Sequence, residues 1–104
     1  MKRVICFLTL LALSSVSVSA QGVGNPRNGA ELARETCSRC HAVRGGDPIS
    51  PNLRAPTFSE LASAPGMTVA ALMVALTTPH AGMPMFMLTQ DEREDIIAYI
   101  LGLK

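Results

Sequence analysis

The chain has 104 residues and a formal net charge of +1, with nine Lys and Arg against eight Asp and Glu. This length accommodates one domain and excludes the large enzyme folds, such as a (β/α)₈ barrel or a complete dinucleotide-binding domain. The balanced charge argues against a nucleic-acid-binding protein, and the hydrophobic content of 48% argues against disorder. With no Trp and four aromatic residues, the chain would build only a thin core, so we expect it to need a disulfide, metal or cofactor.

Residues 1–20 have the composition of an export signal. Lys2 and Arg3 give a positive start, residues 4–13 are mostly apolar, and residues 14–20 are a run of small residues that suits a cleavage site. The apolar stretch is shorter than the about 20 residues of a membrane-spanning helix, so we expect a cleaved signal rather than a retained anchor. Cys6 lies inside this stretch and would leave with it.

Cleavage after Ala20 would leave residues 21–104 as a single domain outside the cytoplasm. That domain has seven Lys and Arg, eight Asp and Glu, and two cysteines, Cys37 and Cys40. Thiols in this compartment tend to oxidise unless other chemistry uses them. The role of these two cysteines is therefore the main question that the sequence raises.

The pattern of the mature domain predicts three main helices and no strand. The first begins at Asn25 and Pro26, a capping residue and a proline suited to a first turn, and ends near residue 36. Glycines and prolines make residues 43–59 a loop, which leaves room for one helical turn over residues 59–62.

The second half of the chain holds the other two predicted helices. Thr68 caps a helix over residues 68–77, which carries no charge between residues 69 and 76 and so has more than one face covered. A loop rich in methionine follows over residues 78–88. Thr89 and Glu92 then form a capping box at the start of the last helix. Its apolar face is made of Ile96, Tyr99, Ile100 and Leu103.

Residues 37–41 read Cys-Ser-Arg-Cys-His, the C-x-x-C-H pattern of covalent haem c attachment. In that chemistry each cysteine sulfur adds to one vinyl group, and the three-residue step lets the two sulfurs span the vinyl separation. His41 is then held under the iron as an axial ligand. We expect its other ring nitrogen to donate to a backbone carbonyl, which fixes the ring.

Three other uses of these residues compete with haem attachment. A thioredoxin-type dithiol needs a βαβ context, which the helical pattern does not provide. A structural disulfide between Cys37 and Cys40 is compatible with export. Zinc could take Cys37, Cys40, His41 and His80, but Cys40 and His41 are adjacent, which is awkward around one tetrahedral ion. The His directly after the second Cys favours haem.

A haem iron held by His41 has a second axial position. Met67 and Met73 belong to the middle helix region and read as core residues. Met83, Met85 and Met87 lie in the Pro- and Gly-containing loop, and their spacing alone does not separate them, although Met83 stands between Gly82 and Pro84. His80 is the alternative ligand and would give a bis-histidine site of low potential.

With these residues in place, the sequence resembles the small bacterial monohaem class I cytochromes c over residues 29–103. The shared features, in chain order, are a Gly eight residues before the first Cys (Gly29), C-x-x-C-H (37–41), Pro-Asn-Leu (51–53), Ala-Pro-x-Phe (55–58), Met-Pro (83–84), Phe-Met-Leu-Thr (86–89) and Tyr-Ile (99–100). Each later motif is weak alone, and in this order after C-x-x-C-H they are strong together.

The resemblance implies an all-α class I cytochrome c fold, with three main helices around one covalent haem c. It implies Met83 as the distal ligand, because the ligating Met of the family commonly precedes Pro. It also implies a proline carbonyl that accepts from His41, for which we prefer Pro51, with Pro56 as the alternative. The residues expected to line the haem pocket are Leu53, Phe58, Leu72, Met85, Phe86 and Tyr99.

In this family the first and last helices cross where a small residue of one packs by an aromatic residue of the other. Here the pair would be Ala33 and Tyr99. Many members carry an aromatic residue at the Ala33 position, so its absence predicts a looser crossing.

The resemblance implies a one-electron carrier rather than an enzyme. We expect a periplasmic monomer of a respiratory chain that exchanges electrons with a dehydrogenase or an oxidase, with no nucleic-acid partner and no stable membrane insertion after cleavage. One alternative is an electron-relay subunit of a larger exported oxidoreductase. A catalytic or gas-sensing haem is a further alternative, which the distal Met disfavours because it closes the iron to other ligands.

Overall fold

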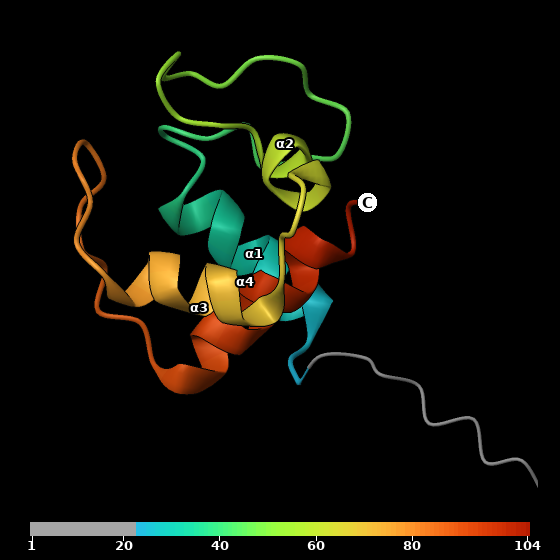
Figure 1. Cartoon of the computed structure of the whole chain (residues 1–104), viewed down its shortest axis with the longest axis vertical. Helices are drawn as coiled ribbons and strands as arrows, with labels where there is room; N and C mark the ends of the chain where they lie inside the picture. Colours follow the sequence, from blue (N-terminus) through green and yellow to red (C-terminus); the bar gives the residue numbers. More distant parts are fainter. Residues whose placement is uncertain (1–22) are drawn as a thin grey trace, which may run out of the picture.

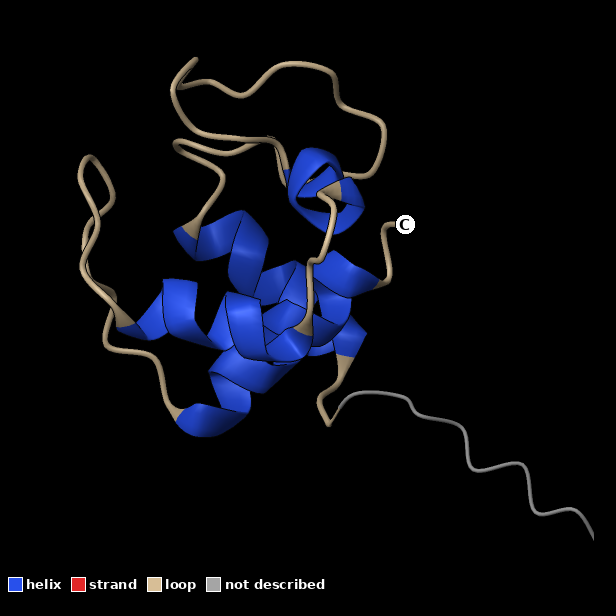
Figure 2. Ribbon diagram, viewed as in Figure 1, coloured by secondary structure: helices blue, strands red, loops and turns tan. Residues whose placement is uncertain are grey.

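The computed structural model describes residues 23–104, so the export-signal hypothesis for residues 1–20 lies outside it. Helices are the regular elements of this part of the chain (Figures 1 and 2). They are α1 (Pro26–Thr36), α2 (Phe58–Ser63), α3 (Val69–Thr77) and α4 (Gln90–Leu101). The expected all-α fold is confirmed, and the single turn expected over residues 59–62 is the six-residue α2. Among these helices, none is long and apolar enough to cross a membrane.

The predicted start of each main helix is capped as its sequence indicates. The Asn25 side chain accepts from the backbone N–H of Arg27 at 2.9 Å, and the Thr68 hydroxyl accepts from Ala71 at 3.1 Å. At α4, the Thr89 hydroxyl accepts from the N–H of Glu92 at 3.2 Å, and the Glu92 carboxylate accepts from the N–H of Thr89 at 2.7 Å. Local side-chain chemistry therefore sets these three boundaries.

Helix α2 has a capping box that the sequence analysis missed. The N–H of Thr57 donates to the Glu60 carboxylate at 2.7 Å, and the N–H of Glu60 donates to the Thr57 hydroxyl at 3.0 Å. The Thr-x-x-Glu pattern is visible in the sequence, but it lies at the end of a proline-containing segment, residues 43–59, that we interpreted as a loop. This box fixes the backbone directly after Pro56.

Helix α4 is the central element, because α1, α2 and α3 all contact it. Its Ile96, Ile97 and Ile100 side chains are at most 2% exposed. The other members of the buried cluster come from the remaining helices and from the segment after α1: Ala33, Cys37, Val43, Phe58, Ala62 and Leu72. Leu72 and Phe58, two of the residues expected to line a haem pocket, are each 3% exposed in this cluster, and their pocket role stays a prediction.

Helices α1 and α4 approach most closely at Gly29. A Cβ atom placed on Gly29 would lie 1.9 Å from the Asp95 carbonyl oxygen and 2.9 Å from Tyr99 Cβ. Ala33, the residue expected at this crossing, is fully buried one turn further along. The closest contact therefore depends on the absence of a side chain at Gly29.

Two long loops extend from this helical base. In Figure 1 residues 37–57 form the teal and green loop above α1, and residues 78–89 form the orange loop beyond α3. These loops carry the C-x-x-C-H motif and the three neighbouring methionines, respectively.

Candidate functional site

The C-x-x-C-H motif continues the end of α1 as one further turn. The N–H of Cys37 donates to Ala33 O at 2.8 Å, and the N–H groups of Cys40 and His41 both donate to Cys37 O, at 3.2 and 2.9 Å. The two cysteines therefore belong to a single turn, and no disulfide joins them. Cys37 is buried and Cys40 is partly exposed. This arrangement matches the spacing that two thioether bonds to one cofactor require.

The environment of Cys37 does not suit a redox dithiol. Burial, and secondarily the charge of Cys40, raises the pKa of the Cys37 thiol to about 11. A raised pKa keeps the thiol protonated at neutral pH, whereas the reactive cysteine of a dithiol oxidoreductase has a lowered pKa. The thioredoxin-type alternative is therefore disfavoured by the site as well as by the fold.

The zinc alternative also lacks the geometry that it needs. Within residues 23–104 no three His, Cys, Asp or Glu side chains lie close enough together to hold a metal ion. His80 is therefore not grouped with Cys37, Cys40 and His41. The fourfold ligand set of a structural zinc site is absent from this part of the chain.

The His41 ring is held by a backbone carbonyl. Its Nδ1 lies 2.7 Å from the carbonyl oxygen of Pro56. A carbonyl can only accept, so Nδ1 carries the proton and Nε2 keeps its lone pair, as in a metal-binding histidine. The ring also packs at a centroid distance of 5.5 Å from Phe58.

The preference for Pro51 as the residue whose carbonyl meets His41 was wrong. The alternative, Pro56, supplies that carbonyl. The N–H of Asn52 donates to Cys40 O at 3.1 Å. In a trans peptide the C=O and the following N–H point in opposite directions, so the Pro51 carbonyl points away from the motif. Pro51 instead lies in the wall of a hollow beside His41.

Residues 42 and 43, directly after the motif, are tied to three other parts of the fold. The N–H of Ala42 donates to the buried Ser50 hydroxyl at 3.0 Å, and Ala42 O accepts from the N–H of Phe58 at 2.9 Å. The Tyr99 hydroxyl donates to Val43 O at 2.6 Å. The motif is thereby linked to its own loop, to α2 and to α4, so its position is defined by the whole core.

The methionine loop presents its three thioethers to different degrees. Met83 is partly buried, whereas Met85 is 49% exposed and Met87 is 97% exposed. Gly82 has φ +82°, a conformation that favours glycine and lets the chain turn directly before Met83. Arg93 of α4 donates from Nη1 to Leu88 O at 2.6 Å and so fixes the end of the loop.

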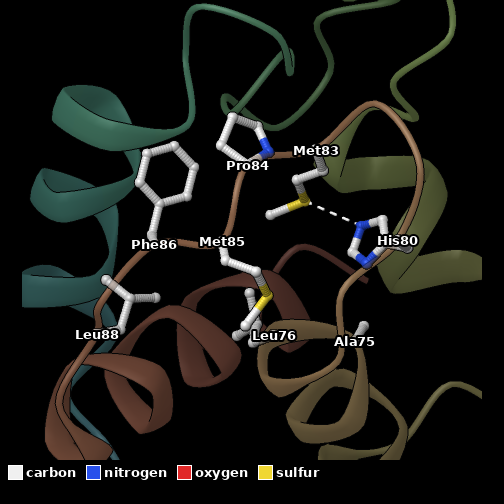
Figure 3. Close-up of a pocket in the computed structure, with 8 residues that line it drawn as sticks. All are labelled: Ala75, Leu76, His80, Met83, Pro84, Met85, Phe86 and Leu88. Carbon is white, nitrogen blue, oxygen red and sulfur yellow. Dashed lines mark hydrogen bonds between the residues drawn. The ribbon is translucent and has the colours of Figure 1, made fainter.

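Figure 3 shows a small hollow in this loop that several predicted residues share. Met83, Met85 and Phe86 line it together with His80, and the Met83 and His80 side chains point toward one another. Of the other expected pocket residues, Tyr99 packs 6.3 Å from Phe58 in the interior. The remaining one, Leu53, is 84% exposed and lines neither hollow, so its pocket role stays a prediction.

The donor set of the site fits haem c. The two cysteine sulfurs share one turn, and the His41 tautomer leaves the lone pair of Nε2 available. A third donor is the partly buried thioether of Met83 in the exposed loop. The site and the helical fold together define a c-type cytochrome, in which haem c is covalently bound and the protein carries electrons.

Comparison with known proteins shows which family of c-type cytochromes this is. Residues 24–100 match the family described as "Cytochrome C oxidase, cbb3-type, subunit III", and the chain belongs to that family. It is also 36% identical over 102 residues to "Cytochrome c-552" of Bradyrhizobium diazoefficiens. The aligned residues make up 98% of this chain and 94% of that protein. No solved structure matches the chain.

Proposed function

We propose that this chain is a periplasmic one-electron carrier in which Cys37 and Cys40 form the two thioethers and His41 and Met83 are the axial ligands of the iron. The observation that carries the proposal is the His41 arrangement, in which the Pro56 carbonyl fixes the ring with Nε2 free, one residue after the second cysteine. Haem c supplies an iron that alternates between ferric and ferrous states and so carries one electron at a time.

The residues around this site have separate tasks. Pro56 orients the His41 ring, and the Thr57–Glu60 capping box fixes the backbone beside Pro56. Phe58 and Tyr99 exclude water on the His41 side, where Phe58 is 3% exposed. Met83 would place a soft sulfur opposite His41, which raises the reduction potential and closes the iron to other ligands.

The choice among the three methionines has a direct test. Met83→Ala should abolish the weak sulfur-to-iron charge-transfer band of the ferric protein and lower the reduction potential, because a thioether ligand raises that potential. Met85→Ala is the matched control, since it removes a thioether from the same hollow and should leave the band intact. Loss of the band in Met85→Ala, with its retention in Met83→Ala, would show that the ligand is misassigned.

Export and attachment can be tested together on protein purified from cells. Residues 1–20 support a cleaved signal, and cleavage after Ala20 predicts a mature chain that begins at Gln21. We expect the intact mass to equal residues 21–104 plus one haem, and the pyridine haemochrome spectrum to show two saturated vinyl groups. A mass that includes residues 1–20 would instead indicate a retained anchor.

A second candidate function is that of an electron-relay subunit in a larger complex. The observation that favours it is the description of the matching family, which names a subunit of an oxidase. The match to a protein named as a cytochrome c-552 over 94% of its length favours a separate carrier. Size-exclusion chromatography of a native periplasmic extract separates the two, because a carrier elutes as a monomer and a subunit elutes with its complex.

A further inference from the structure

A second potential ligand lies beside Met83 in the same loop. His80 Nε2 is 3.1 Å from Met83 Sδ, the contact drawn as a dashed line in Figure 3. The backbones of the two residues form an isolated antiparallel bridge, with the N–H of Met83 directed at His80 O. A nitrogen donor and a sulfur donor are therefore presented at nearly the same place.

The tautomer of His80 resembles that of His41. His80 Nδ1 lies 3.1 Å from Thr78 O, just as His41 Nδ1 lies beside Pro56 O. A neutral imidazole has one N–H, and a carbonyl oxygen is a better acceptor than a thioether. His80 thus faces two acceptors, and its single N–H can satisfy only one of them. With the proton on Nδ1, toward the stronger acceptor, His80 Nε2 keeps its lone pair and touches the Met83 sulfur without a hydrogen bond.

The loop also has room to exchange the two side chains. His80 is exposed, so no core packing holds its ring in place. A Cβ atom placed on Gly82, between the two residues, would meet nothing within 4 Å. A small change in this short turn could present either side chain without disturbing the helices, since Leu88 and Arg93 fix the loop further on.

We infer that His80 is a reserve ligand of the same iron, which takes the sixth position when the Met83 thioether is lost. This inference rests on the proposed function, in which Met83 is the normal ligand. Replacing a thioether by an imidazole lowers the reduction potential, because the softer sulfur ligand favours ferrous iron. After loss of the Met83 thioether, the loop would thus keep the iron closed to external ligands, and the reduction potential would be lower.

The test compares holoproteins by absorption and electron paramagnetic resonance spectra and by binding of cyanide and carbon monoxide. Met83→Ala should lose the charge-transfer band, remain low-spin with a bis-imidazole spectrum, and resist both ligands. The double variant Met83→Ala/His80→Ala should become high-spin and bind both. Met83→Ala/Met85→Ala is the matched control and should stay closed, because it keeps His80. His80→Gln alone should retain the wild-type band.

The outcomes separate this inference from the proposed function. A charge-transfer band that persists in Met83→Ala refutes Met83 as the ligand, and the reserve role of His80 with it. A lost band with a high-spin, open iron overturns the reserve role alone, and so does a double variant that remains closed. Free imidazole added to the double variant should restore the bis-imidazole spectrum, which establishes that its haem site is intact. Met83→Leu replaces Met83→Ala if the smaller side chain prevents folding.

Discussion

His41 and His80 each place Nδ1 against a backbone carbonyl oxygen, but the two rings are restrained to different degrees. His41 is fixed by the Pro56 carbonyl and by Phe58, and the residues after it are bound to Ser50 and Tyr99. His80 has a carbonyl partner within its own loop and is exposed. At the scale of single residues, the proposed iron site would thus combine one rigid nitrogen ligand with a distal loop that can adapt.

The cysteines give a prediction about thiol chemistry in the purified holoprotein. In the proposed site two thioether bonds would leave Cys37 and Cys40 without thiols, so iodoacetamide should add no mass to the purified protein. The reaction must be done in denaturant at about pH 8.5, near the ordinary cysteine pKa. In the folded protein the pKa of Cys37 is raised to about 11, so a free thiol would become thiolate only as the pH rises toward that value. Addition of one or two carbamidomethyl groups would refute full covalent attachment.

At the scale of helices, the crossing of α1 and α4 predicts the effect of one added methyl group. Gly29→Ala should destabilise the protein despite the better helix propensity of Ala, because its Cβ would collide with the Asp95 carbonyl. Overpacking of this kind costs about 1–3 kcal/mol, seen as a lower midpoint in denaturant titration followed by circular dichroism.

Asn28→Ala is the matched control for this crossing. Asn28 precedes Gly29 in α1 and its side chain is exposed, so the substitution changes helix propensity without touching α4. We expect its free energy of unfolding to stay within about 0.5 kcal/mol of the wild type or to increase slightly. Equal destabilisation by both substitutions would mean that the loss of stability in Gly29→Ala does not come from the close approach of α1 and α4.

Helix starts could be predicted from sequence because each depends on a few neighbouring residues. Asn25, Thr68 and Thr89 cap their helices through partners within three residues. The carbonyl that meets His41 could not be predicted in this way. Its choice depends on the Asn52–Cys40 hydrogen bond, which turns the Pro51 carbonyl away, and on where α2 begins. The contact between His80 and Met83 likewise depends on how the loop folds back on itself.

The closest contact between α1 and α4 is another feature that the sequence alone did not predict. The family resemblance placed Ala33 and Tyr99 at the crossing. The structure places Gly29 at the closest approach, against the Asp95 carbonyl and Tyr99 Cβ of α4, while Ala33 is buried one turn away. Periodicity identifies which face of a helix is buried, but the point of closest approach depends on the crossing of two helices distant in sequence.

At the scale of the whole molecule, charge is distributed so that neither sign dominates. Acidic residues gather at the start of α4, where Asp91 and Glu92 lie in its first turn, and Arg34 lies in the last turn of α1. After removal of residues 1–20 the chain would have seven basic and eight acidic residues. The long-range field is therefore weak, and we expect apolar contacts to decide how redox partners dock, with exposed Ala81 and Met85 as candidates.

This charge balance predicts a weak dependence of electron transfer on salt. Steering by strong fields raises association rates by about 10- to 1,000-fold, and salt removes that gain. The second-order rate constant of electron exchange with a partner can be measured by stopped flow. It should change by less than about tenfold as the ionic strength is raised to 0.15 M, where the Debye length is about 8 Å.

Met85→Glu should slow the reaction at every salt concentration, because it places a charge in an apolar contact. A steep decline of the wild-type rate with salt would instead show that a local charge cluster guides docking.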